Sequence, residues 1–384
     1  MKLATQVWLT VFVLAALSRV QGQESSSPPV SPDEETAQKE KDGKKKPPDK
    51  EKQAPPAVAF DVPPPQNRMD LSDRQLPRAP EMLGDLPPPK GFFHLLSIFT
   101  TKPVTLSSDG VLPGTREFKV ADNGSPRPQD RVYASFGHFD DLFPGANHRP
   151  GDSIGDIGLF REYVGLEKTF LGGIASLDIR MPINTLVVES RRPDLNGSHT
   201  DVGDLSLIFR YALYRDDERD NWLTTGLAVT APTGPRNLGG ITISTIPGRE
   251  FPHSTILQPF VAYLWNVGDF YLQGFSALDT PTDDRDVVFV FNDIGIGYFV
   301  YRTTAPRFLT AVAPAFEVHV TNPTNHLGKE TFANPLQTSN IVDLGLVANL
   351  ELNHRSRLSF GVVTPVTGPK PFNTEALVQF RVRY

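Results

Sequence analysis

Residues 374–384 read TEALVQFRVRY, and their alternation is the clearest structural signal in the chain. Successive side chains of a β-strand point to opposite sides, so this segment has one apolar and one polar face. The apolar face carries Ala376, Val378, Phe380, Val382 and Tyr384. The opposite face carries Glu375, Gln379, Arg381 and Arg383. The pattern predicts a strand with a hydrated side and a greasy side that ends in an aromatic residue.

Composition excludes several classes of protein. The sequence contains no cysteine, which excludes disulfides, thiolate metal sites, cysteine nucleophiles and a lipidated N-terminal cysteine. A net charge of −6 gives no basic field for nucleic acid. Residues 1–22 resemble a secretory signal peptide. Beyond them no apolar run reaches the roughly 20 residues of a membrane-spanning helix, so a membrane-embedded form of this chain would cross with strands.

Two segments precede the region of regular alternation. Residues 23–90 are rich in Pro, Lys, Glu, Ser and Asp, which predicts a disordered tether. Its lysine cluster at 41–52 is either a solvated spacer or a contact to acidic cell-wall polymer. Residues 91–130 mix an apolar run with turn signals. These residues are either a plug in the mouth of the β-barrel that the rest of the chain predicts, or an approach to its first strand.

Residues 131–384 repeat strand signals at the rhythm of an all-β chain, with lengths near those of tilted membrane strands. The predicted strands are 131–138, 157–170, 173–183, 203–214, 222–231, 255–265, 269–278, 287–300, 309–320, 341–350, 355–364 and 374–384.

The connections between these strands alternate between short and long. In an up-and-down barrel this places tight turns at one end and long loops at the other. We therefore predict an antiparallel transmembrane β-barrel of about 12 strands in a bacterial outer membrane. The even number of strands places both the N-terminal tether and the C-terminus in the periplasm. The ranges 255–265 and 269–278 fit the alternation poorly, because Gln258, Pro259 and Gln273 disturb both faces.

The polar faces supply the candidate functional residues, because they would line a wet lumen. Charges of both signs would either select polar solutes or pair with one another and fill a narrow barrel. The predicted lumen residues are Arg161, Glu167, Asp178, Arg180, Asp204, Arg210, Glu317, His319, Asp343, Arg381 and Arg383.

Three stretches carry family resemblances. The terminal strand resembles the closing strand of bacterial outer-membrane barrels, which implies that Phe380 and Tyr384 are read by the barrel-assembly machinery. Residues 203–235, with Gly203-Asp204, a charged turn and Pro232-Thr233-Gly234, resemble the outer-membrane family grouped around meta-pathway phenol degradation. That resemblance implies a transporter-like barrel for small or hydrophobic compounds. Residues 122–141 resemble the first-strand region of secreted planctomycete proteins of unknown function.

Enzyme chemistry and metal binding find little support in the sequence. Ser198, His199 and Asp201 lie in one turn-rich loop, and no G-x-S-x-G elbow occurs in the mature chain. The acidic and histidine clusters lack calcium-loop or zinc spacing. We expect no catalysis, no metal and no cofactor.

Three functions remain. The first is a passive channel or transporter in contact with outer-membrane lipid and a small-molecule solute. The second is a sealed structural or interaction barrel that anchors the outer membrane to the cell wall through residues 23–90. The third is a secreted soluble β-barrel or sandwich, with its apolar face turned inward.

Overall fold

The computed structural model describes residues 76–85, 118–142, 154–190, 196–235, 253–284, 286–325, 340–368 and 370–384. The chain divides into two units, Met1–Pro64 and Pro65–Tyr384, and all described residues belong to the second. Among these residues no helix is long and apolar enough to cross a membrane.

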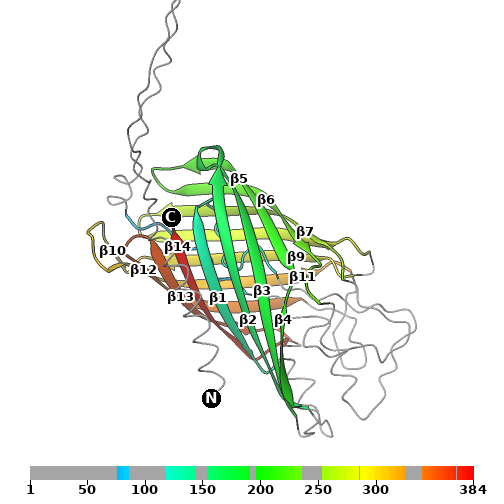
Figure 1. Cartoon of the computed structure of the whole chain (residues 1–384). Coiled ribbons are helices and arrows are strands. Elements are labelled where there is room, and N and C mark those ends of the chain that lie inside the picture. The colour runs from blue at the N-terminus through cyan, green and yellow to red at the C-terminus, as the bar shows by residue number, and fades with distance from the viewer. Residues whose placement is uncertain are drawn as a thin grey trace, which may run out of the picture. The chain divides into compact units, whose positions relative to one another are not determined.

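The described residues form one antiparallel sheet that closes on itself (Figure 1). The strands are β1 (Arg131–Asp140), β2 (Ile154–Phe170), β3 (Ala175–Ser190), β4 (Gly197–Val202), β5 (Leu205–Asp216), β6 (Asn221–Ala231), β7 (Ile256–Val267), β8 (Phe270–Pro281), β9 (Phe289–Tyr298), β10 (Tyr301–Arg302), β11 (Leu309–Pro323), β12 (Ile341–Leu352), β13 (Ser356–Pro365) and β14 (Thr374–Arg383). A 3-10 turn, Leu171–Gly173, joins β2 to β3.

Closure comes from the first and last strands. β1 pairs with β14 from Arg131 opposite Arg383 to Asp140 opposite Thr374. Two short strands do not count as separate staves of the barrel. The strand β4 pairs only with β3, and β10 pairs with β11 next to the contact of β9 with β11. The result is a closed 12-stranded antiparallel barrel, and the predicted fold is confirmed.

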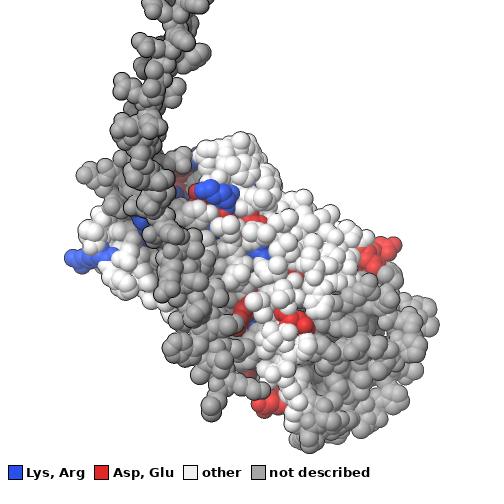
Figure 2. Space-filling model, viewed as in Figure 1, with Lys and Arg blue, Asp and Glu red and all other residues white. Residues whose placement is uncertain are grey.

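Strand parity sorts side chains between the two faces of the sheet. On β14 the buried positions are Glu375, Leu377, Gln379 and Arg381, whereas Ala376 and Val378 are exposed. The same inversion recurs around the barrel, where large apolar side chains are exposed and charged ones are buried. The space-filling view shows a face over the strands with few charged groups (Figure 2).

The misfit of β7 and β8 has a physical explanation. Gln258 and Gln273 face inward and are buried, as their parity requires. Their inward neighbours Phe260 and Phe275 are apolar, and so are most outward residues of both strands, although Ser276 of β8 is polar and exposed. Alternation is weak here because apolar side chains occupy inward positions as well as outward ones.

Candidate functional site: the barrel lumen and its plug

The charged residues predicted for the lumen are almost all buried. Ten of them are at most 7% exposed, namely Arg161, Glu167, Asp178, Arg180, Asp204, Arg210, Glu317, His319, Asp343 and Arg381. The remaining residue, Arg383, is half-buried at the turn end and donates to Glu351 and to the carbonyl of His354. Sequence reasoning missed wall residues such as Asp293, Arg357 and Glu375, although strand parity places each of them inward.

Two segments preceding β1, residues 76–85 and 118–130, lie inside the barrel, and we call them the plug. They bond to each other, since Met82 N donates to the Gly124 carbonyl (2.9 Å) and Asn123 N to the Leu83 carbonyl (3.2 Å). Residues 76–85 fall in the range predicted as a tether, and most of them lie among the buried residues of the barrel. Residues 118–130 fall in the range predicted as either a plug or an approach to the first strand. The remainder of 23–90, and residues 91–117, lie outside the described residues.

The wall binds the plug backbone directly. The carboxylate of Glu317 accepts hydrogen bonds from the backbone N–H groups of Leu83 and Gly84, each at 2.9 Å. Gln379 donates to the Leu83 carbonyl at 2.8 Å. Gly84 has φ +80°, and a Cβ there would lie 2.3 Å from Asp122 Cα, so only glycine fits this crossing of the two segments.

Apolar contacts hold the plug against one side of the barrel wall. Met82, Phe118 and Val120 of the plug pack against a buried wall surface made by Ile208, Ala228, Phe260, Ala262, Phe275, Ala277, Val287, Phe289 and Phe291. Leu83 occupies a second apolar socket of Val347, Val363 and Leu377. Burial of such side chains typically contributes about 1.5–3 kcal/mol each, which favours a stably seated plug.

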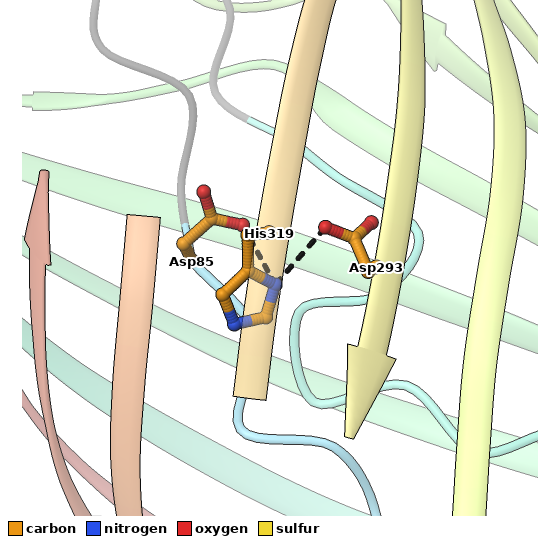
Figure 3. A group of neighbouring side chains, drawn as sticks. All are labelled: Asp85, Asp293 and His319. Atoms are coloured by element: carbon orange, nitrogen blue, oxygen red, sulfur yellow. Dashed lines mark hydrogen bonds and ion pairs between the residues drawn. The ribbon is translucent and has the colours of Figure 1, made fainter. Parts of the chain in front are cut away.

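An ion cluster joins the plug to β9 and β11. Lys119 Nζ lies 2.6 Å from Asp85 Oδ1 and 2.8 Å from Asp293 Oδ1. His319 Nδ1 lies 3.3 Å and 3.0 Å from the same two oxygens (Figure 3). Burial acts to raise the pKa of Asp85, but Lys119 and then His319 outweigh it and lower that pKa to about 2. Burial would lower the pKa of Lys119, yet Asp293 and Asp85 raise it well above its ordinary value.

Asp85, Asp293 and His319 also have the spacing of a metal site, because their ligand atoms lie within 4.8 Å of one another. The ammonium of Lys119 already contacts both carboxylates there. The cluster is therefore complete as a set of ion pairs, with lysine as its cation.

A second network lies on β1, β2, β3 and β5. Arg131 Nε is 2.7 Å from Glu167 Oε2, and Arg210 NH1 is 3.2 Å from Asp178 Oδ2. Arg180 NH1 donates to Asp122 of the plug at 3.2 Å, and Tyr163 donates its hydroxyl proton to the same carboxylate at 2.7 Å. These predicted lumen charges pair with one another and with the plug.

A third network lies nearer the turn end. Glu81 of the plug meets Arg357 NH1 at 2.8 Å and Arg381 NH1 at 3.1 Å. Burial acts to raise the pKa of Glu81, but Arg357 and Arg381 lower it well below its usual range. A cleft of about 1100 Å³ opens here, lined by Leu76–Ala79, Asp217–Asn221, Trp265–Gly268, Arg302 and Thr304.

Several predicted residues lie apart from these networks. Asp204, between β4 and β5, accepts from Gly234 N (2.8 Å) and contacts His253 Nε2 (2.9 Å), so it fixes a connection at the loop end. Ser198 and His199 are successive strand residues and point to opposite sides of β4. That arrangement does not pair a nucleophile with a base.

Of the two residues of the terminal strand signal, Phe380 lies within β14 and Tyr384 follows its last residue. Phe380 is half-buried on the outer face, and Tyr384 is 52% exposed. Their recognition by assembly machinery stays a prediction.

Neither a protein-family model nor a curated protein sequence matches this chain. Among solved structures, an outer membrane channel from Pseudomonas putida F1 is 14% identical with a TM-score of 0.48, over 73% of this chain and 100% of that one. The NanC porin is 11% identical (TM-score 0.39), over 66% and 98% of the two chains. The beta domain of the Bordetella autotransporter BrkA is 12% identical (TM-score 0.40), over 66% and 99%.

Proposed function

We propose that the protein is a bacterial outer-membrane barrel that acts as a passive channel or transporter for small or hydrophobic compounds, and that the plug occludes it in this conformation. The observation that carries the proposal is the inversion of the barrel. Leu346 is 67% exposed on the outer face, whereas Arg161 and Arg210 are buried inside. Large apolar side chains such as that of Leu346 are exposed around the outer face of the barrel. Such a surface is unfavourable in water and favourable in hydrocarbon.

Aromatic pairs at the turn end support a membrane position. Tyr214 and Trp265 contact edge to face with centroids 5.9 Å apart, and Phe270 lies 4.6 Å from Tyr298. Tyr and Trp favour the boundary between hydrocarbon and water. The turn end would then face the periplasm, with the tether and the C-terminus, and the assembly machinery would read Phe380 and Tyr384.

The plug also favours a second function, a sealed structural barrel tethered to the cell wall through residues 23–90. Its backbone and side chains engage three parts of the wall, through Glu317, Arg180 and Arg357. A barrel whose interior is filled in this way can serve as a structural protein without passing a solute.

Planar-bilayer recording separates the two functions. The full chain is compared with Leu83→Arg, which places a charge in the apolar socket of Val347, Val363 and Leu377 and should expel the plug. We expect conductance to rise several-fold in the variant. A heat-dependent shift in gel migration would show that the variant barrel is folded. Absence of conductance in both proteins would contradict the channel and favour the sealed barrel.

A further inference from the structure

The buried charges of the inner wall are divided between two halves of the barrel. One half is made by the adjacent strands β13, β14, β1, β2, β3 and β5, and the other by β6, β7, β8, β9, β11 and β12. All buried arginines of the described strands lie in the first half, namely Arg131, Arg161, Arg180, Arg210, Arg357 and Arg381. The buried acids of that half are Glu167, Asp178 and Glu375. The charged residues buried in the second half are Asp279, Asp293, Glu317, Asp343 and Glu351, beside the imidazole of His319.

Three of these arginines stand in one row across the first half. Arg357 of β13 lies opposite Arg381 of β14, and the row continues across β1 and β2 to Arg180 of β3. Arg357 also meets Glu351 of β12, where the two halves adjoin. The row therefore sets guanidinium groups along one side of the lumen.

The plug turns carboxylates toward this arginine row. Glu81 meets Arg381 NH1 at 3.1 Å, and Asp122 meets Arg180 NH1 at 3.2 Å. In the part of the chain that the structure describes, neither arginine forms an ion pair with a carboxylate of the wall. Both guanidinium groups therefore lose their carboxylate partners when the plug leaves the lumen.

The plug turns donors toward the acidic half. Lys119 Nζ lies 2.8 Å from Asp293 Oδ1, and Glu317 accepts two backbone N–H groups of the plug. Asp85 is a plug carboxylate on this side, but Lys119 and His319 neutralise it there. The plug thus has the charge distribution of a zwitterion, with its carboxylates against the arginines and its ammonium group against the acids.

A solute that replaces the plug meets arginines on one side and carboxylates on the other. Guanidinium groups bind carboxylates through charge-assisted hydrogen bonds, and carboxylates bind ammonium groups in the same way. We propose that the open barrel passes small zwitterions, which carry a carboxylate and an ammonium group on one molecule, in preference to other small solutes. A solute with a single charge is attracted by one half and repelled by the other, and a neutral solute gains from neither. This inference rests on the channel function proposed above and names its solute class.

The flux of radiolabelled solutes into proteoliposomes tests the preference. The full chain carries Leu83→Arg or Gly361→Ala, since each substitution disturbs the socket of Leu83 and should open the barrel. The solutes share one carbon skeleton: the zwitterion γ-aminobutyrate, the anion γ-hydroxybutyrate, the cation γ-aminobutyramide and the neutral γ-hydroxybutyramide. At low ionic strength we expect γ-aminobutyrate to cross several-fold faster than each of the others. Added salt should reduce the difference, because it screens the charges of the hydrated lumen.

The arginine row is tested in the same opened chains. The double substitution Arg180→Gln and Arg381→Gln should remove the preference for γ-aminobutyrate and leave the flux of the neutral solute unchanged. Arg355→Gln is the matched control, because Arg355 is exposed in the turn between β12 and β13 and the substitution removes the same charge. That variant should keep the preference.

The outcomes separate the solute class from the channel itself. Equal flux of all these solutes through an opened, folded barrel would overturn the solute class and leave the channel in place. A preference for γ-aminobutyrate that survives the loss of Arg180 and Arg381 would also overturn it. Absence of flux for every solute in both opened variants, each shown to be folded by its gel migration, would contradict the channel and the solute class together.

Discussion

Lys119 Nζ and Asp293 Oδ1 lie 2.8 Å apart inside the barrel, although one belongs to the plug and the other to β9 of the wall. Both side chains are fully buried. A buried ion pair holds its partners in register but costs much to break, because the group left behind is charged and unsolvated. This pair therefore makes the seating of the plug testable.

Lys119→Ala should destabilise the protein by about 3–5 kcal/mol, the usual cost of removing one partner from a buried ion pair. It leaves Asp85 and Asp293 facing each other without their ammonium group. Urea unfolding in detergent, followed by tryptophan fluorescence, measures the change. Lys168→Ala is the control, because that side chain is 61% exposed in its pair with Asp130 and its loss should cost at most about 1 kcal/mol. Equal losses of unfolding free energy in both variants would contradict the role of the buried Lys119–Asp293 pair in seating the plug.

Acid should release the plug through Asp85. The folded pKa of Asp85, about 2, lies below the ordinary value of 3.8, so the ionised carboxylate stabilises the folded state. That contribution is fully present above pH 4 and is lost as the pH falls toward 2. Conductance or protease sensitivity measured from pH 5 to pH 2 should rise over this window. Asp85→Asn should raise both already at pH 5 and flatten the dependence, whereas an unchanged pH profile in this variant would exclude Asp85 as its source.

The barrel could be predicted from sequence because strand parity alone sorts residues between the two faces. Glu317 and His319 are two residues apart on β11, so their common inward direction needs no knowledge of neighbours. Strand parity does not predict the partners of these two side chains. Glu317 contacts the backbone of Leu83, 234 positions earlier, and that contact exists only once the sheet has closed.

The plug was harder to predict because its conformation depends on contacts with the barrel wall. Residues 76–85 read LPRAPEMLGD, which has neither a strand period nor a helix period and resembles the preceding tether in composition. Met82 and Leu83 are buried only because Phe260, Phe275 and the Val363 socket receive them. Phe260 on β7 and Phe275 on β8 put apolar side chains on the inner faces of these two strands, which weakens their alternation.

Gly361→Ala should unseat the plug while sparing the sheet. A Cβ at this position would lie 2.1 Å from Leu83 Cδ2, so the leucine must move. The chain has no cysteine, and Ser125→Cys, at a plug position 3% exposed, would report plug exposure through its rate of maleimide labelling. We expect labelling about tenfold faster with Gly361→Ala, which corresponds to about 1.4 kcal/mol lost from the seated state. Gly197→Ala is the control, since nothing lies within 4 Å of its added Cβ; similar labelling rates in both proteins would contradict the socket.

Arginine substitutions on the outer face of the barrel test whether that face lies in hydrocarbon or in water. Leu346 lies near the middle of β12 and is 67% exposed, so Leu346→Arg puts a charge where the membrane hypothesis places hydrocarbon. At the bilayer midplane this costs about 2–4 kcal/mol and falls to about 0–1 kcal/mol near the interface. Val267→Arg is the matched variant, because Val267 is 76% exposed at the turn end of β7. Unfolding free energies in lipid vesicles should therefore differ by about 2 kcal/mol or more between the two variants. In a soluble barrel both changes would be surface substitutions worth at most about 0.5 kcal/mol, so equal and small effects would contradict a lipid-facing belt.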